Sequence, residues 1–190
     1  SFPTRRSSDL LLSDGSVSSI GEIGEVISNY RFKLSNEISE KYVNNDDALF
    51  PVAIVEAELL LDGLNTQVYS LNTEFIIYLR LKGNIDTRYS IEVLIKNQHK
   101  ESILFSPLGL ITNTDFKINV DQEMEIKLKL NLPTLAAGRY YIDLMTVISG
   151  FKFLHYAEDA LSFTIEHSYI KETGWNFRQE RGQGSVLIYA

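Results

Sequence analysis

The sequence predicts a mainly β protein in which an antiparallel β-sandwich makes up most of the chain. Apolar residues alternate with polar ones over most segments after residue 51, which is the period of a half-buried strand. Residue pairs typical of turns separate these segments, among them Asp62-Gly63 and Ser149-Gly150. No helical pattern of comparable strength lies between the segments, which disfavours a parallel α/β fold. Two packed antiparallel sheets, immunoglobulin-like or jelly-roll-like, fit the pattern.

The first ten residues resemble the in-frame translation of a common sequencing-library adapter. Nine consecutive residues, Phe-Pro-Thr-Arg-Arg-Ser-Ser-Asp-Leu at positions 2–10, match that translation. We therefore expect residues 1–10 to contribute to neither fold nor function. We also expect the natural protein to extend further toward its N-terminus.

The next forty positions predict a small α/β element and a connector. Residues 10–20 form a hairpin around Asp14-Gly15, and Gly21 ends its second strand. Four apolar residues then follow at the spacing of one helical face, Ile23, Val26, Ile27 and Tyr30. A polar helix can continue over residues 31–43, until a run of Asn and Asp at 44–47 and Pro51 end it.

Nine strands are expected in the main domain. They lie at residues 52–61, 73–82, 90–96, 103–105, 124–130, 139–148, 151–156, 161–166 and 185–189. Alternation assigns these residues to the core: Phe75, Ile77, Leu79, Leu81, Tyr140, Ile142 and Leu144. We also assign the aromatic pair Phe151 and Phe153 to the core.

Composition excludes several classes of protein. The 190 residues include no Cys and three scattered His, which rules out a disulfide scaffold and cysteine-based metal sites. A formal charge of −7 without a basic cluster argues against nucleic acid as a partner. No apolar run approaches the roughly 18 residues of a membrane span, so the chain is expected to be soluble. No metal site is predicted.

Two sequence patterns resemble one protein family. The order of Asp14-Gly15, Gly21, Val26-Ile27 and Tyr30 resembles the last segment of an ABC-transporter ATPase domain. Residues 132–144, with Gly138 and Tyr140 in a "Leu-x-x-Gly-x-Tyr" arrangement, resemble the C-terminal domain of Wzt-type ATPases, which export O-antigen and related polysaccharides. The resemblance divides the chain into an adapter-like stretch (1–10), an ATPase remnant (11–30), a partly helical linker (31–50) and a carbohydrate-binding sandwich (51–190).

The resemblance implies a function for the sandwich and a setting for the parent protein. In this family the ATPase half drives transport and the appended sandwich recognises the glycan without catalysis. The intact parent would use ATP and Mg²⁺ and would bind a transmembrane permease subunit, in the cytoplasm against the bacterial inner membrane. This fragment contains no Walker A arrangement, so we expect no ATP binding or hydrolysis and no cofactor here. A homodimer formed by exchange of the C-terminal strand is a further expectation, although that strand could equally close its own sheet.

Sugar recognition requires aromatic rings beside hydrogen-bonding side chains on an open face. Five residues that alternate with core residues meet this requirement, provided that their strands are neighbours: Tyr78, Arg80, Glu92, Tyr141 and Asp143. Trp175 is a sixth candidate. The alternatives are that the five are ordinary solvent-facing residues and that Trp175 anchors a loop. His155 is interpreted as a structural hydrogen-bonding residue.

Two other functions stay open at this level. The sandwich could hold ATPase dimers together without contacting the substrate. It could also be a carbohydrate-active enzyme, which would need a pair of carboxyl groups across a groove, with Glu92 and Asp143 as the candidates.

Overall fold

The computed structural model describes residues 9–13, 16–21, 41–61, 64–65, 74–113, 115–166, 168 and 175–188. The chain divides into two compact units, Ser1–Ile38 and Ser39–Ala190. In the first unit, β1 (Asp9–Ser13) and β2 (Ser16–Gly21) pair as the expected antiparallel hairpin. Asp9 and Leu10 belong to β1 and pair with Gly21 and Ile20, so the adapter-like stretch is not wholly outside the fold. The helix expected after Gly21 lies outside the described residues.

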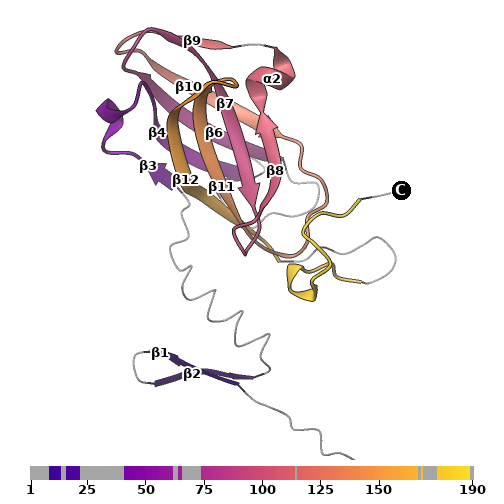
Figure 1. Cartoon of the computed structure of the whole chain (residues 1–190). Coiled ribbons are helices and arrows are strands. Elements are labelled where there is room, and N and C mark those ends of the chain that lie inside the picture. Colours follow the sequence, from indigo (N-terminus) through magenta and orange to yellow (C-terminus); the bar gives the residue numbers. More distant parts are fainter. Residues whose placement is uncertain are drawn as a thin grey trace, which may run out of the picture. The chain divides into compact units, whose positions relative to one another are not determined.

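The second unit is an antiparallel β-sandwich, which confirms the predicted fold class (Figure 1). One layer, here called the β6 sheet, has the strand order β10 (Glu123–Leu130), β6 (Phe75–Gly83), β4 (Val52–Leu61) and β3 (Lys41–Val43), with β5 (Leu64–Asn65) also paired to β4. The other layer, here called the β11 sheet, has the order β12 (Lys152–Ile165), β11 (Gly138–Ile148), β7 (Thr87–Lys96) and β8 (Ser102–Pro107), with β9 (Phe116–Ile118) also paired to β7.

The core lies between the two sheets and consists of the alternating apolar residues of each strand. Every residue of β6 and β11 that alternation assigned to the core is buried. Aromatic rings pack both within and between the layers. Phe163 on β12 stacks on Tyr140, its cross-strand neighbour on β11, with ring centroids 5.1 Å apart, and it meets the edge of Phe75 in the other sheet at 4.9 Å. Burial of this apolar surface is the main force that holds the sandwich together.

Several predicted elements are wrong in type or extent. The two strands expected at 151–156 and 161–166 are one strand, β12 (Lys152–Ile165), which continues through a bulge. Residues 41–43 form β3 and not the end of a helix, because Lys41 to Val43 pair with the open edge of β4. The expected strand at 185–189 is reduced to a single bridge, between Val186 and Leu135, in the described residues. The short elements β9, α2 (Leu108–Thr112), η1 (Asp47–Leu49) and η2 (Gln179–Arg181) were not anticipated.

His155 joins the two sheets at one edge of the sandwich, which confirms its structural interpretation. Its Nδ1 accepts a hydrogen bond of 2.8 Å from the backbone N–H of Ile54 on β4. Nδ1 must therefore be unprotonated, so the proton is on Nε2, which faces the hydroxyl of Tyr42 at 3.3 Å. The ring also stacks on Phe50 with centroids 3.8 Å apart. Burial lowers the pKa of His155 to about 4, so the residue is neutral at pH 7.

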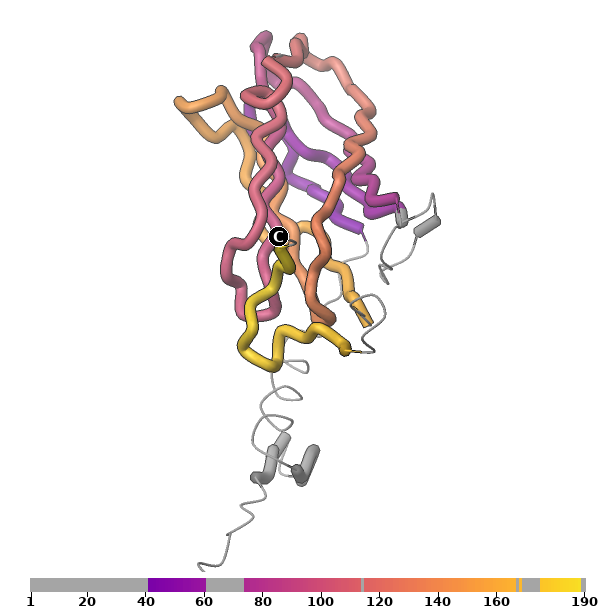
Figure 2. The backbone as a smooth tube through the Cα atoms, turned by 90° about the vertical axis from the view of Figure 1, so that its right-hand side faces the viewer, coloured from indigo at the N-terminus to yellow at the C-terminus, as the bar shows by residue number. Residues whose placement is uncertain are grey.

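The turn between β11 and β12 and the first residues of β12 carry exposed aromatic rings, which corrects the assignment of Phe151 and Phe153 to the core. Phe151 is 83% exposed and Phe153 is 61% exposed. Figure 2 shows this turn projecting beyond the sandwich, which explains why its side chains find no core to enter. None of the helices in the described part of the chain combines the length and apolar character needed to cross a membrane.

Candidate carbohydrate-binding face

The predicted site residues do not form one patch, because they lie on the two opposite outer faces of the sandwich. Tyr78 and Arg80 alternate with the core residues of β6 and lie on the outer face of the β6 sheet. Glu92 on β7, together with Tyr141 and Asp143 on β11, lies on the outer face of the β11 sheet. The condition that all these strands be neighbours therefore holds for β7 and β11 and fails for β6.

The outer face of the β6 sheet is an ion-paired surface. Arg80 lies 2.8 Å from a carboxylate oxygen of Glu56 and 3.5 Å from one of Glu123, and Lys41 also contacts Glu56. A hydrogen bond with Glu125 raises the pKa of Tyr78. These side chains largely satisfy one another, as on many solvated sheet faces.

The outer face of the β11 sheet, here called the β11 face, contains an unexpected buried carboxylate. Asp143 has an exposed fraction of 0% although its side chain points away from the core. The reason is a bulge in β12: residues 158–160 stand opposite the single residue Asp143. At the bulge Asp159 takes a positive φ of 48° and its backbone N–H donates to Oδ1 of Asp143 at 2.7 Å.

Two further donors complete the surroundings of Asp143. Lys96, which pairs with Tyr141 in the register of β7 and β11, places Nζ 2.7 Å from Asp143 Oδ1. The hydroxyl of Tyr156 donates to Oδ2 at 2.5 Å. This hydrogen bond, with some burial, raises the pKa of Tyr156 to about 12. A buried carboxylate needs such partners because an unpaired buried charge is costly.

Lys96 and Lys100 tie the bulge to the sheet. Nζ of Lys96 also lies 2.7 Å from Asp159 Oδ1, and Nζ of Lys100 lies 2.7 Å from Asp159 Oδ2. Burial acts to lower the pKa of Lys96, but its hydrogen bonds to Asp143 and Asp159 outweigh this effect and leave the pKa raised. Burial would raise the pKa of Asp159, yet hydrogen bonds from Lys100 and Lys96 hold it below its ordinary value. Lys96 and Asp159 are therefore charged at pH 7.

Lys100 also covers Tyr141. Its ammonium nitrogen lies 2.9 Å from the centroid of the Tyr141 ring, in a cation–π contact. Tyr141 is buried as a result, so its ring is not an open platform. The sequence-based expectation that Tyr141 and Asp143 face solvent is wrong, because loop and bulge residues fold over them.

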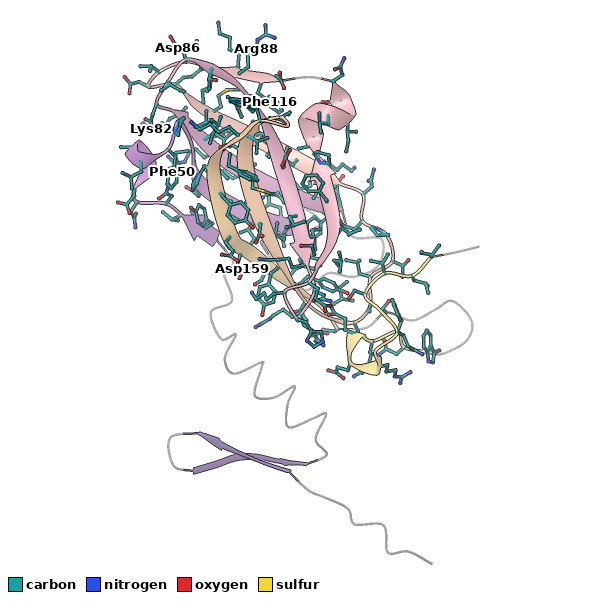
Figure 3. The ribbon with its side chains drawn as sticks, in the orientation of Figure 1. Phe50, Lys82, Asp86, Arg88, Phe116 and Asp159 are labelled. Carbon is teal, nitrogen blue, oxygen red and sulfur yellow. The ribbon has the colours of Figure 1, made fainter. Side chains whose placement is uncertain are left out.

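Two exposed aromatic rings of β12 lie beside the ionic cluster, which consists of Lys96, Lys100, Asp143, Glu158 and Asp159. Tyr156 is 42% exposed, and its ring meets that of Phe153 at 5.9 Å with an interplanar angle of 73°. The side chain of Glu158 on the bulge is 70% exposed. The β11 face thus combines apolar rings with a hydrogen-bonding carboxylate, which is the combination that sugar binding requires. Figure 3 places Asp159 well away from Asp86, Arg88 and Phe116, which lie at the other end of the sandwich.

The carboxyl pair suggested for an enzyme is not arranged for catalysis. Asp143 accepts from Lys96, Tyr156 and the Asp159 N–H, and no part of it reaches solvent. Glu92 is half-buried, and burial raises its pKa. A glycosidase needs both carboxyl groups free to reach the scissile bond.

Trp175 belongs to the C-terminal segment, and its contacts agree with a packing role. Its ring stacks on the buried ring of Phe177 with centroids 5.9 Å apart, and the guanidinium carbon of Arg181 lies 5.9 Å from the Trp175 ring centroid. The segment is held by backbone hydrogen bonds to residues 134–137, including Ala137 N–H to Phe177 O at 2.7 Å.

Most of the residues that define the β11 face were not predicted from the sequence pattern: Lys96, Lys100, Phe153, Tyr156, Glu158 and Asp159. Lys96 and Tyr156 fall on one face only through the strand register and the bulge, which alternation within a single strand does not reveal. Within the described ranges, no group of three or more His, Asp or Glu side chains is arranged to hold a metal ion.

Comparison with known proteins supports the fold. No protein-family model matches the sequence, and no curated protein does. Among solved structures, the C-terminal domain of Wzt superposes with a TM-score of 0.58 and 11% sequence identity, over 79% of this chain and 84% of that domain. The chain has a Wzt-like C-terminal fold. At this level of identity the likeness concerns the backbone arrangement alone.

Proposed function

We propose that the sandwich is a non-catalytic glycan-recognition domain and that it binds sugars on the β11 face. The observation that carries this proposal is the exposed ring pair of Phe153 and Tyr156, which lies beside the exposed Glu158. The C–H faces of a sugar ring pack on aromatic rings, while its hydroxyls donate to carboxylates. Of the residues suggested by sequence, Tyr141, Asp143 and Glu92 belong to this face, where Asp143 and Tyr141 support the exposed groups from below.

The Wzt-like fold extends this proposal to the parent protein. The parent would be the ATP-binding subunit of an ABC transporter that exports O-antigen or a related polysaccharide. It would use ATP and Mg²⁺ in an upstream ATPase domain and would lie in the cytoplasm against the inner membrane, bound to its permease. The hairpin β1–β2 agrees with the expected end of that ATPase domain. Recovery of an upstream reading frame with Walker A and signature motifs would test this parentage.

Calorimetric titration of the whole chain with bacterial oligosaccharides tests glycan binding. Tyr156→Ala and Phe153→Ala should each weaken binding by about tenfold, the equivalent of about 1.4 kcal/mol of lost contact. Tyr78→Ala is the matched control, because Tyr78 lies on the opposite outer face. Loss of binding in Tyr78→Ala alone would move the site to the β6 sheet.

A structural sandwich that only holds subunits together is the second candidate. Absence of binding to every oligosaccharide at millimolar concentration would favour it. Dimerisation would use the C-terminal segment, in which Val186 bridges Leu135 and the Ala136 N–H donates to the carbonyl of Ser185 at 2.9 Å within one chain. Exchange of this segment between two chains would form the same bonds in trans. Deletion of residues 184–190 with no change of mass in light scattering would contradict such a dimer.

A further inference from the structure

The charges of the β11 face restrict the class of sugar that it can bind. Resting on the glycan-binding function proposed above, we propose that this face recognises uncharged or amino sugars and rejects acidic ones. The ligand would be a neutral or amino-sugar segment of a polysaccharide, and uronic acids or phosphorylated sugars would be excluded.

The ionic cluster has more carboxylates than ammonium groups. Its three acids, Asp143, Glu158 and Asp159, face two bases, Lys96 and Lys100, so its formal charge is −1. Glu92 on the neighbouring strand adds a further carboxyl group to the same face. The field over this face is therefore negative, which attracts cations and repels anions.

Neither lysine is available to bind an anionic sugar. Lys96 is 7% exposed at its side chain, and its ammonium group contacts Asp143 and Asp159 at 2.7 Å each. The Lys100 ammonium is engaged by Asp159 at 2.7 Å and by the Tyr141 ring. Arg139, which lies on the same side of β11 by alternation, is buried. A sugar carboxylate would have to break one of these contacts to gain a cationic partner.

Glu158 is the charge that the ligand meets first. It is far more exposed than Lys96, Asp143 or Asp159, and its nearest cation, Lys96 Nζ, is 3.7 Å away. A carboxylate offers only acceptor oxygens, which suit sugar hydroxyls and ammonium groups. The ionised carboxylate of a uronic acid has no hydrogen-bond donor to offer Glu158, and the two negative charges repel each other.

Matched sugars on a glycan array, followed by calorimetry at low salt, test this inference. The pairs are glucose against glucuronate and galactose against galacturonate oligomers, with N-acetylglucosamine against glucosamine as the amino arm. We expect every oligosaccharide that binds to be neutral or amino, and its acidic counterpart to bind at least about tenfold more weakly. Binding of an amino-sugar oligomer should weaken as salt increases.

Glu158→Lys should reverse the preference for neutral and amino sugars over acidic ones. The substitution should raise the affinity for the acidic oligosaccharide by about fivefold or more and should lower the affinity for the amino sugar by a similar factor, because the sign of one exposed charge is inverted. Glu125→Lys makes the same charge change on the exposed outer face of the β6 sheet and should leave all affinities unchanged. Equal binding of neutral and acidic partners, or no effect of Glu158→Lys, would overturn the charge inference and leave glycan binding standing. An array on which no glycan binds would overturn both proposals.

Discussion

Acid should destabilise the sandwich through His155, and replacement of His155 by Asn should remove much of that pH dependence. In the folded chain Nδ1 of His155 accepts from the Ile54 N–H, and the ring is stacked on Phe50 in a buried position. Protonation of Nδ1 would place its new N–H donor against the N–H donor of Ile54 and would bury an unpaired charge. Asn keeps an acceptor oxygen near the position of Nδ1 but does not titrate.

The size of the effect follows from the pKa of His155, which burial lowers from 6.5 to about 4. Between these two values the unfolded chain binds a proton that the folded chain does not, so the free energy of unfolding falls as pH falls. The stabilisation is fully present above pH 6.5 and is lost as pH falls through about 4. A difference of about 2.5 pKa units corresponds to about 3 kcal/mol in total, at about 1.36 kcal/mol per unit. About 2 kcal/mol of this loss should occur between pH 7 and pH 5.

Urea unfolding at pH 7, 6 and 5 measures this contribution. His155→Asn should be less stable than the unsubstituted chain at pH 7, because it loses the ring contacts with Phe50 and Tyr42. Between pH 7 and pH 5, its free energy of unfolding should fall by about 2 kcal/mol less than that of the unsubstituted chain. His99→Asn is the matched control at an exposed position and should keep the full pH dependence. If all three proteins lose stability in parallel, the pKa of His155 is close to normal and the reasoning fails.

Three predictions concern packing. Gly109→Ala should cost about 1 kcal/mol or more, because an added Cβ would overlap the side chain of Ser90 on β7. Measured by urea unfolding in a Ser90→Gly background, the same change should cost clearly less, with Oγ of Ser149 at 3.2 Å as the remaining close contact, and an equal cost in both backgrounds would exclude the Ser90 contact as its cause. Phe163→Ala should lower the free energy of unfolding by about 3–5 kcal/mol, since this ring is 1% exposed between Tyr140 and Phe75. Phe151→Ala, at an exposed ring, should stay within about 0.5 kcal/mol, and a large loss there would contradict its place outside the core.

The β11 face contains residues that a strand pattern predicts and residues that it does not. Glu92 was found because its strand alternates regularly, and β7 does lie beside β11. Tyr78 has the same alternation, yet its strand belongs to the other sheet. Nothing local in the sequence distinguishes the two cases, because the pairing of strands depends on contacts between residues far apart in the chain.

The fold class and the core residues of the regular strands can be predicted from the sequence alone. Both follow from a period of two in the apolar residues, which the strand geometry converts directly into a buried and an exposed side. The structural role of His155 is predicted on other grounds, because no Ser or Asp lies at a spacing that suggests catalysis. The burial of Asp143 and Tyr141 and the joint exposure of Phe153 and Tyr156 depend on long-range pairing. The bulge opposite Asp143 and the Lys100 side chain cover the first two residues, and a second register shift, between Phe153 and His155, puts Phe153 and Tyr156 on the same side of β12. A bulge shifts the register of every side chain beyond it, so the composition of the face is set by strand pairing and not by the pattern within any one strand.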